Sequence, residues 1–287
     1  MFDNWINERN IKCFDIKEFF ESREIGDGSL GKAFYTNKNL GTRSFVLKSI
    51  NVNDIIVEEL VNDLEMRRKF NAHVNILKFY GVVKCQPETG QYLLVMEYAN
   101  SGALRQYLKE KFEKLTWDDK YHLATQLVTL ISNLHDEEIV HGYLNSNALL
   151  VHENTLKLKF FKKVNKKDRE FQTDPSMYPY TDPNLFKINV TPLLDKKNDV
   201  YSVGILLWEI SSGKPPFGDN CSFELVIKII NGYREQIIPN TPVDYSKLYT
   251  ECWDDDPAKR PSIIFCETPY SVILNVLRLI SYRPQDN

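Results

Sequence analysis

The sequence predicts an α+β protein, with strand patterns in its first part and helical patterns in its second. Residues 22 to 98 contain short alternating apolar runs separated by turn residues, which is the pattern of strands. Residues 117 to 135 and 199 to 213 repeat their apolar side chains at helical spacing. Between these helices, residues 139 to 162 read as two apolar strands joined by a loop. The strand patterns therefore come first in the chain and the helical patterns later.

Composition places the chain among ordinary globular proteins. Its 287 residues are enough for two packed lobes with a core of their own. The net charge of −3 gives no overall bias toward nucleic acid or membrane. Five cysteines without C-x-x-C spacing favour a reducing compartment, so we expect a cytoplasmic protein. The first residues are too polar for a signal peptide, and no apolar run reaches membrane-spanning length.

The first elements surround a glycine-rich turn. Residues 1 to 21 are expected to form an N-terminal extension. The aromatic side chains expected to dock it onto the body are Trp5, Phe14, Phe19 and Phe20. A G-x-G-x-x-G motif then leads into an apolar alternation that begins at Ala33; its glycines are Gly26, Gly28 and Gly31. This motif alone is weak, because any glycine turn in a hairpin produces it.

A lysine-bearing strand and a helix follow. Residues 44 to 50 predict an apolar strand with one internal lysine, Lys48. Residues 54 to 70 predict a helix from apolar residues at helical spacing. Residues 75 to 83 and 92 to 98 predict two strands, separated by a turn that contains Pro87 and Gly90.

The second half is helical. A short helix is expected over 103 to 111, after the break at residues 100 to 102. Thr116 and Asp119 form a capping-box pattern that opens the helix over 117 to 135. The apolar helix that begins near Asp199 is expected to end at Gly213, and further helices are expected over 223 to 231, 245 to 253 and 270 to 281. A basic run over 157 to 169 is interpreted as a solvated loop, with a docking surface for an acidic partner as the alternative.

Several of these strings together resemble a protein kinase domain, in wording closest to the tyrosine-kinase-like branch. The most specific string is D-V-Y-S-x-G-x-x-x-W-E over 199 to 209, followed by G-x-x-P-F. The glycine motif, Lys48 and the loop that begins at His141 occur in the order expected of such a domain. The resemblance implies a bilobal α+β fold, with a β-rich N-lobe over 22 to 99, a larger helical C-lobe over 100 to 283 and a tail over 284 to 287.

The resemblance also implies the residues of a remnant ATP cleft. Met96 is expected as the gatekeeper and residues 97 to 99 as the hinge, while Asp63 or Glu59 is expected to pair with Lys48. The full set is Gly26, Gly28, Gly31, Ala33, Val46, Lys48, Asp63, Met96, Glu97, Ala99 and Leu150. Asp199 is expected to support the catalytic loop through His141. The usual A-P-E string has become Asp182-Pro183-Asn184, and the arginine that pairs with its glutamate is kept as Arg260.

The departures from the kinase pattern fall on catalysis. Tyr143 stands where the base aspartate belongs, and Ala148 and Phe160 stand where the two metal ligands belong. Alanine and phenylalanine bring no oxygen to a divalent ion, so no metal site is expected. Either Asn145 or Asn147 could take the place of the missing asparagine. No cofactor is required on this view, and any ATP binding is expected to be weak and metal-independent. Lys159 or Lys162 is a hypothetical replacement for part of the metal's charge.

The function predicted from these substitutions is a catalytically inactive kinase-like domain, and not an enzyme. It would act in signalling as a scaffold or allosteric partner of another protein, with an active kinase among the candidates, and without nucleic acid. The alternative is a nucleotide-binding protein with residual or unconventional phosphotransferase activity toward serine, threonine or tyrosine.

Overall fold

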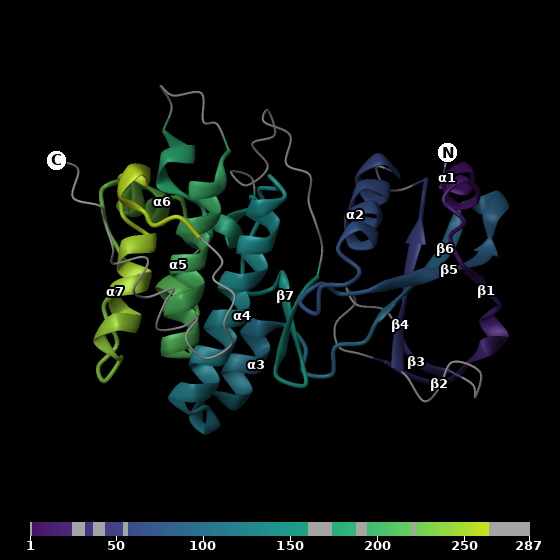
Figure 1. Cartoon of the computed structure of the whole chain (residues 1–287), viewed down its shortest axis with the longest axis horizontal. Coiled ribbons are helices and arrows are strands. Elements are labelled where there is room, and N and C mark those ends of the chain that lie inside the picture. Colours follow the sequence, from purple (N-terminus) through teal and green to yellow (C-terminus); the bar gives the residue numbers. More distant parts are fainter. Residues whose placement is uncertain are drawn as a thin grey trace. The chain divides into compact units, whose positions relative to one another are not determined.

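The computed structural model describes residues 2–24, 32–36, 44–53, 57–159, 174–187, 194–219 and 222–263. The chain divides into two compact units, shown with their elements in Figure 1. The first comprises Met1–Asn100 with Lys157–Lys163, and the second comprises Ser101–Leu156 with Val164–Asn287. The helix predicted over 270 to 281 lies outside the described residues.

The first unit is built on a six-stranded sheet in the order β1-β5-β6-β4-β3-β2. Strand β1 runs parallel to β5, and the other neighbours are antiparallel. The elements of this unit are α1 (Phe2–Glu8), β1 (Cys13–Phe14), β2 (Phe19–Glu24), β3 (Lys32–Thr36), β4 (Ser44–Asn51), α2 (Val57–Lys69), β5 (Phe79–Gln86) and β6 (Gln91–Glu97). The lysine-bearing strand, the helix and the two following strands of the prediction are therefore confirmed within a few residues.

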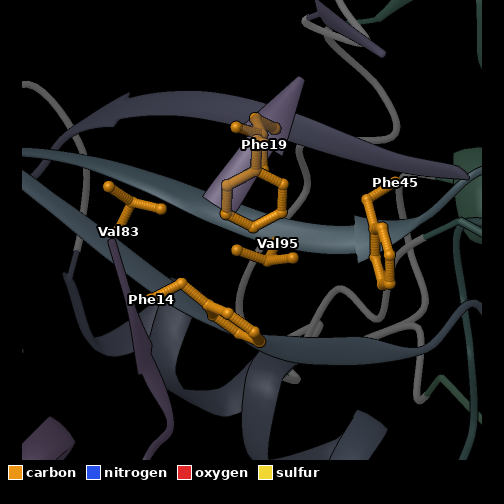
Figure 2. Close-up of a cluster of buried hydrophobic side chains, with 6 residues drawn as sticks. Phe14, Phe19, Phe45, Val83 and Val95 are labelled. Carbon is orange, nitrogen blue, oxygen red and sulfur yellow. The ribbon is translucent and has the colours of Figure 1, made fainter. Parts of the chain in front are cut away.

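The N-terminal residues contribute directly to the hydrophobic core of this unit. Figure 2 shows the buried cluster, in which Phe14 of β1 and Phe19 of β2 pack with side chains of β4, β5 and β6. Its members are Phe14, Phe19, Phe45, Leu47, Val83 and Val95. Phe20 is 51% exposed, so the expectation that it docks the N-terminal segment is wrong. Alternation along β2 explains this, because neighbouring side chains point to opposite faces of a sheet.

A helix that the sequence analysis missed, α1, lies against α2 and the sheet. Its Phe2, Trp5 and Ile6 are buried. The Trp5 indole donates a hydrogen bond to Glu65 of α2 at 2.7 Å. Asp3 accepts hydrogen bonds from Lys84 and from the hydroxyl of Tyr92, and burial together with this bond raises the pKa of Tyr92 to about 12. The N-terminal helix is thus attached both to α2 and to the sheet.

We expect Trp5→Phe to lower the free energy of unfolding of this unit by about 1 kcal/mol, since it removes one hydrogen bond and keeps an aromatic ring. Chemical denaturation of the single variants and of the double variant with Glu65→Gln measures the coupling between the two side chains. Strictly additive losses would show that the bond contributes nothing.

The second unit is helical around α5 (Lys196–Ser212), every residue of which from Asn198 onward is buried. Helices α4 and α7 pack against it. Its other elements are α3 (Leu104–Lys111), α4 (Trp117–Asp136), β7 (Leu149–His152), α6 (Phe223–Ile230) and α7 (Val243–Cys252). Strand β8 (Thr155–Leu158) begins in this unit, and its last two residues belong to the first unit. The capping box at Thr116 is confirmed, and α5 ends at the left-handed Gly213 as predicted. None of the helices in the described ranges is long and apolar enough to cross a bilayer.

Candidate active site

Asp199 of α5 binds the backbone of the loop that starts at His141. The Asp199 carboxylate accepts hydrogen bonds from the backbone N–H of His141 at 2.8 Å and of Gly142 at 2.7 Å. The ring nitrogen Nε2 of His135 lies 2.9 Å from the same carboxylate. Asp199 is fully buried, and Gly142 adopts φ +69°, a conformation that suits glycine. The expected support of the loop by Asp199 is therefore present, and it acts through backbone groups.

Tyr143, at the position of the expected base, reaches a carboxylate from elsewhere in the chain. Its hydroxyl donates a hydrogen bond to Asp174 Oδ2 at 3.2 Å, although the two residues are 31 positions apart. The other oxygen of Asp174 accepts from the N–H and the hydroxyl of Ser176, so Asp174 caps the 3₁₀ helix Pro175–Tyr180. The carboxylate of Asp174 therefore lies beside Tyr143, the residue that stands where the kinase pattern has an aspartate. No local sequence pattern signals this pairing.

The loop does not fit a magnesium ion in the part of the chain that the structure describes. Ala148 is fully buried and has no side-chain oxygen. The Asn145 amide oxygen already accepts from the backbone N–H of Asn147 at 2.9 Å and of Ala148 at 3.1 Å. Asn145 therefore stabilises the turn and is not directed at an ion. The same ranges contain no group of three or more His, Cys, Asp or Glu side chains that could hold a metal.

A buried polar cluster joins Ser146 of the loop to Tyr180, the last residue of the 3₁₀ helix Pro175–Tyr180. The Tyr180 hydroxyl donates to Glu209 of α5 at 2.6 Å and lies 3.0 Å from the hydroxyl of Ser146. Arg105 of α3 donates to Tyr180 and forms an ion pair with Glu209 at 2.8 Å. Burial, followed by the charge of Glu209, raises the pKa of Tyr180 well above its usual value. Burial likewise raises the pKa of Glu209, against the opposing charge of Arg105.

A buried ion pair connects the residues just after Tyr180 to the residues that follow α7. Asp182 and Arg260 form a bidentate ion pair, and both side chains have 0% exposure. Asn198 of α5 donates to Asp182 at 2.8 Å. The acid that pairs with Arg260 therefore lies two residues before Asn184, whose place in the string normally holds the glutamate. Asn184 instead bonds to the Asp182 carboxylate and to the backbone of Asp255.

In the first unit, three of the predicted cleft residues lie side by side on neighbouring strands. Ala33 of β3 is opposite Val46 of β4, which is opposite Met96 of β6. Val46 and Met96 are buried, and so is Ala99. The Glu97 carboxylate binds Lys157 at 2.7 Å and accepts from the backbone N–H of Lys78, so this side chain has a structural role.

The expected pairing of Lys48 with helix α2 is not found among the described residues. The Asp63 carboxylate binds Arg67, with distances of 3.0 Å and 3.1 Å, because the i,i+4 spacing on one helix brings the two side chains together. Glu59 is exposed, and no ion pair joins it to Lys48 within the described ranges. Arg67 is itself buried and donates to the carbonyls of Leu77 and Lys159.

The remaining site predictions divide between the second unit and the undescribed residues. Leu150 is buried in β7 of the second unit, where it bridges to Ala103. The three motif glycines Gly26, Gly28 and Gly31, together with Phe160 and Lys162, lie outside the described residues, so their predicted roles stay predictions.

Comparison with known proteins identifies what the chain resembles. Residues 20–268 match the family described as protein tyrosine and serine/threonine kinase. A probable LIM domain-containing serine/threonine-protein kinase of Dictyostelium discoideum is 29% identical over 93% of this chain and 42% of its own length. Serine/threonine-protein kinase VIK of Arabidopsis thaliana is 30% identical over 86% of this chain and 58% of its own. The chain therefore spans less than two thirds of either relative.

This comparison contradicts the prediction that the chain is not an enzyme. The relatives that it matches over most of its length, including the Dictyostelium discoideum drkC protein, are named as serine/threonine-protein kinases, although identity is only about 30%. The prediction considered three positions one at a time. It could not include groups brought in from other parts of the chain, of which Asp174 beside Tyr143 is the example.

Proposed function

The chain belongs to the protein tyrosine and serine/threonine kinase family, and on this premise we propose that it transfers phosphate to serine or threonine hydroxyls of a partner protein through a rebuilt reaction site. The observation that carries the proposal is the hydrogen bond between Tyr143 and Asp174. It brings a carboxylate to the residue that stands in the position of the family's base. The naming of the relatives as serine/threonine kinases supports the same reaction.

The proposed step uses Tyr143 and Asp174 as a proton relay. The substrate oxygen attacks the terminal phosphorus of ATP, and ADP leaves with the electron pair of the broken P–O bond. The hydroxyl proton passes to the Tyr143 oxygen while the Tyr143 proton passes to Asp174 Oδ2, which it already contacts. Asp199 holds the backbone of the loop in place for this transfer. No step is assigned to a metal ion, because the described loop does not fit one.

A second function, regulation of another kinase by direct binding, is favoured by the buried Ala148 and the engaged oxygen of Asn145. A domain that lacks these metal contacts would still present an ordered protein surface. The expected partner is an active kinase. We further propose a reducing, intracellular setting, since Cys13 and Cys85 are exposed free thiols.

A transfer assay separates the two functions. With labelled ATP and a protein substrate we expect slow transfer that Lys48→Met abolishes and that Asp174→Asn lowers by about 100-fold, the usual contribution of a general base. Asp118→Asn is the matched control, because this exposed aspartate belongs to the first turn of α4 and not to the loop that starts at His141.

Absence of transfer beyond that of Lys48→Met, with EDTA, Mg²⁺ or Mn²⁺, would overturn the phosphotransferase proposal. Specific recovery of an active kinase in a pull-down would then support the second function. Transfer that is unchanged in Asp174→Asn would keep the activity and exclude the relay.

A further inference from the structure

The 3₁₀ helix Pro175–Tyr180 contacts the loop that starts at His141 along one face. A 3₁₀ helix has about three residues per turn, so its N-cap Asp174, Met177 and Tyr180 lie on the same side. Met177 and Tyr180 are buried, whereas Asp174 is partly exposed. In order, these three side chains contact the loop residues Tyr143 at 3.2 Å, Asn145 at 3.0 Å and Ser146 at 3.0 Å. The position of Asp174 is therefore tied to the position of the whole short helix.

The hydroxyl of Tyr180 has charged partners on two sides. Arg105 can only donate, and it donates to the Tyr180 oxygen at 2.6 Å. The Tyr180 hydroxyl gives its own proton to the Glu209 carboxylate, also at 2.6 Å. Arg105 further donates to the hydroxyl of Ser146 at 3.1 Å. Because Tyr180 is buried, no solvent is at hand to replace a lost bond, so this end of the helix is firmly fixed.

Helix α5 supports both the short helix and the loop. Ser202 of α5 donates to the main-chain carbonyl of Tyr180 at 2.8 Å, and Glu209 of the same helix accepts from its hydroxyl. Asp199, also on α5, binds the backbone of the loop at His141. The loop that carries the tyrosine of the proposed relay and the helix that carries its aspartate are thus bound to one common element.

The contact between Tyr143 and Asp174 has little tolerance for movement. Its length of 3.2 Å lies at the long end of the range of about 2.6–3.2 Å over which a catalytic proton passes. A further separation of about 0.4 Å would end the hydrogen bond. A small shift of the short helix would therefore disconnect the two groups.

We propose that Tyr180 is a positioning residue, whose hydrogen bonds to Arg105 and Glu209 keep the short helix where Asp174 reaches Tyr143. This inference rests on the proposed function, because it assigns Tyr180 a role in the relay. Tyr180 does not exchange protons itself. Burial, followed by the charge of Glu209, raises the pKa of its hydroxyl well above the usual value, so the hydroxyl stays protonated at neutral pH.

Tyr180→Phe tests the proposal, since it keeps the ring and removes the hydroxyl. The kcat of phosphate transfer should fall by roughly tenfold, as expected for loss of a hydrogen bond to a charged group, with the KM for ATP unchanged. Because Tyr180 acts through Asp174, the double variant with Asp174→Asn should be no slower than Asp174→Asn alone. Tyr245→Phe is the matched control: it also removes a buried tyrosine hydroxyl of the second unit, one that donates to the carbonyl of Leu207, and should leave kcat unchanged.

A spectroscopic measurement reports the contact without any need for transfer. In protein containing tyrosine labelled with ¹³C at Cζ, the NMR signal of Tyr143 is identified by its loss in Tyr143→Phe. This signal should shift in Asp174→Asn, because the hydroxyl loses its carboxylate acceptor. It should shift in the same direction in Tyr180→Phe and stay in place in Tyr245→Phe.

An unshifted Tyr143 signal in Tyr180→Phe would overturn the proposal, whether or not the protein transfers phosphate. Losses of kcat that add in the double variant would also overturn it, since Tyr180 would then act by another route. A shifted signal without any transfer would keep the contact and remove only the phosphotransferase function. The melting temperature of each variant establishes that it is folded, and if Tyr180→Phe does not fold, Ser146→Ala removes one partner of the same hydroxyl and takes its place.

Discussion

Asp182→Asn is expected to lower the free energy of unfolding of the second unit by about 3–5 kcal/mol, the usual cost of breaking a buried ion pair by removing one partner. The Asp182 carboxylate and the Arg260 guanidinium form two parallel contacts at 0% exposure. After the substitution, the guanidinium would remain buried without a counter-charge. An amide in place of the carboxylate would also direct N–H groups toward other donors, including Asn198.

Urea denaturation monitored by tryptophan fluorescence measures this loss. Asp255→Asn is the matched control, because Asp255 pairs with Arg234 in the same unit but is 65% exposed at its side chain. An exposed pair contributes below about 1 kcal/mol. If the two variants lost equal stability, the Asp182–Arg260 pair would not have the structural importance that its burial indicates.

Asp199→Ala is expected to cost about 4 kcal/mol, since the backbone N–H groups of His141 and Gly142 would each lose their acceptor at roughly 1–3 kcal/mol apiece. The loss should be local as well as global. Hydrogen exchange measured by mass spectrometry should show faster exchange at these two amides, because the carboxylate is what protects them.

Asp195→Ala, on the same helix, is the control for Asp199→Ala. Asp195 caps the first turn of α5 by accepting from the N–H of Lys197 and of Asn198. Loss of such a cap costs about 1 kcal/mol. Slow exchange at His141 and Gly142 in Asp199→Ala would mean that other contacts order the loop, and would argue against the supporting role of Asp199.

Features that depend on neighbours in the sequence could be predicted before the structure. The capping box at Thr116 and Asp119 lies within four consecutive residues, so its pattern is visible directly. The apolar string of α5 and its glycine end were likewise predicted, because helical spacing and a left-handed C-cap are local requirements. Helix α1 was missed, since its stability depends on contacts with α2 and the sheet rather than on its own seven residues.

The candidate site was predicted in outline only. The resemblance led us to expect the loop from His141, its support by Asp199, and Val46 and Met96 in one cleft. That Val46 and Met96 lie opposite each other on adjacent strands is a finding of the structure. The ion pair of Asp63 with Arg67 was missed, although the i,i+4 pattern was present in the sequence. That signal competed with the expected pair to Lys48, and the sequence offered no means of ranking the two.

The sequence by itself determined the order of most elements, the family resemblance, and the absence of a side-chain oxygen at Ala148 and Phe160. Only the tertiary structure decided which charged and polar groups meet. Asp174 reaches Tyr143 across 31 positions and Asp182 reaches Arg260 across 78. The physical reason is that secondary structure follows from short-range periodicity, whereas a hydrogen bond or ion pair between distant segments forms only after their backbones have packed.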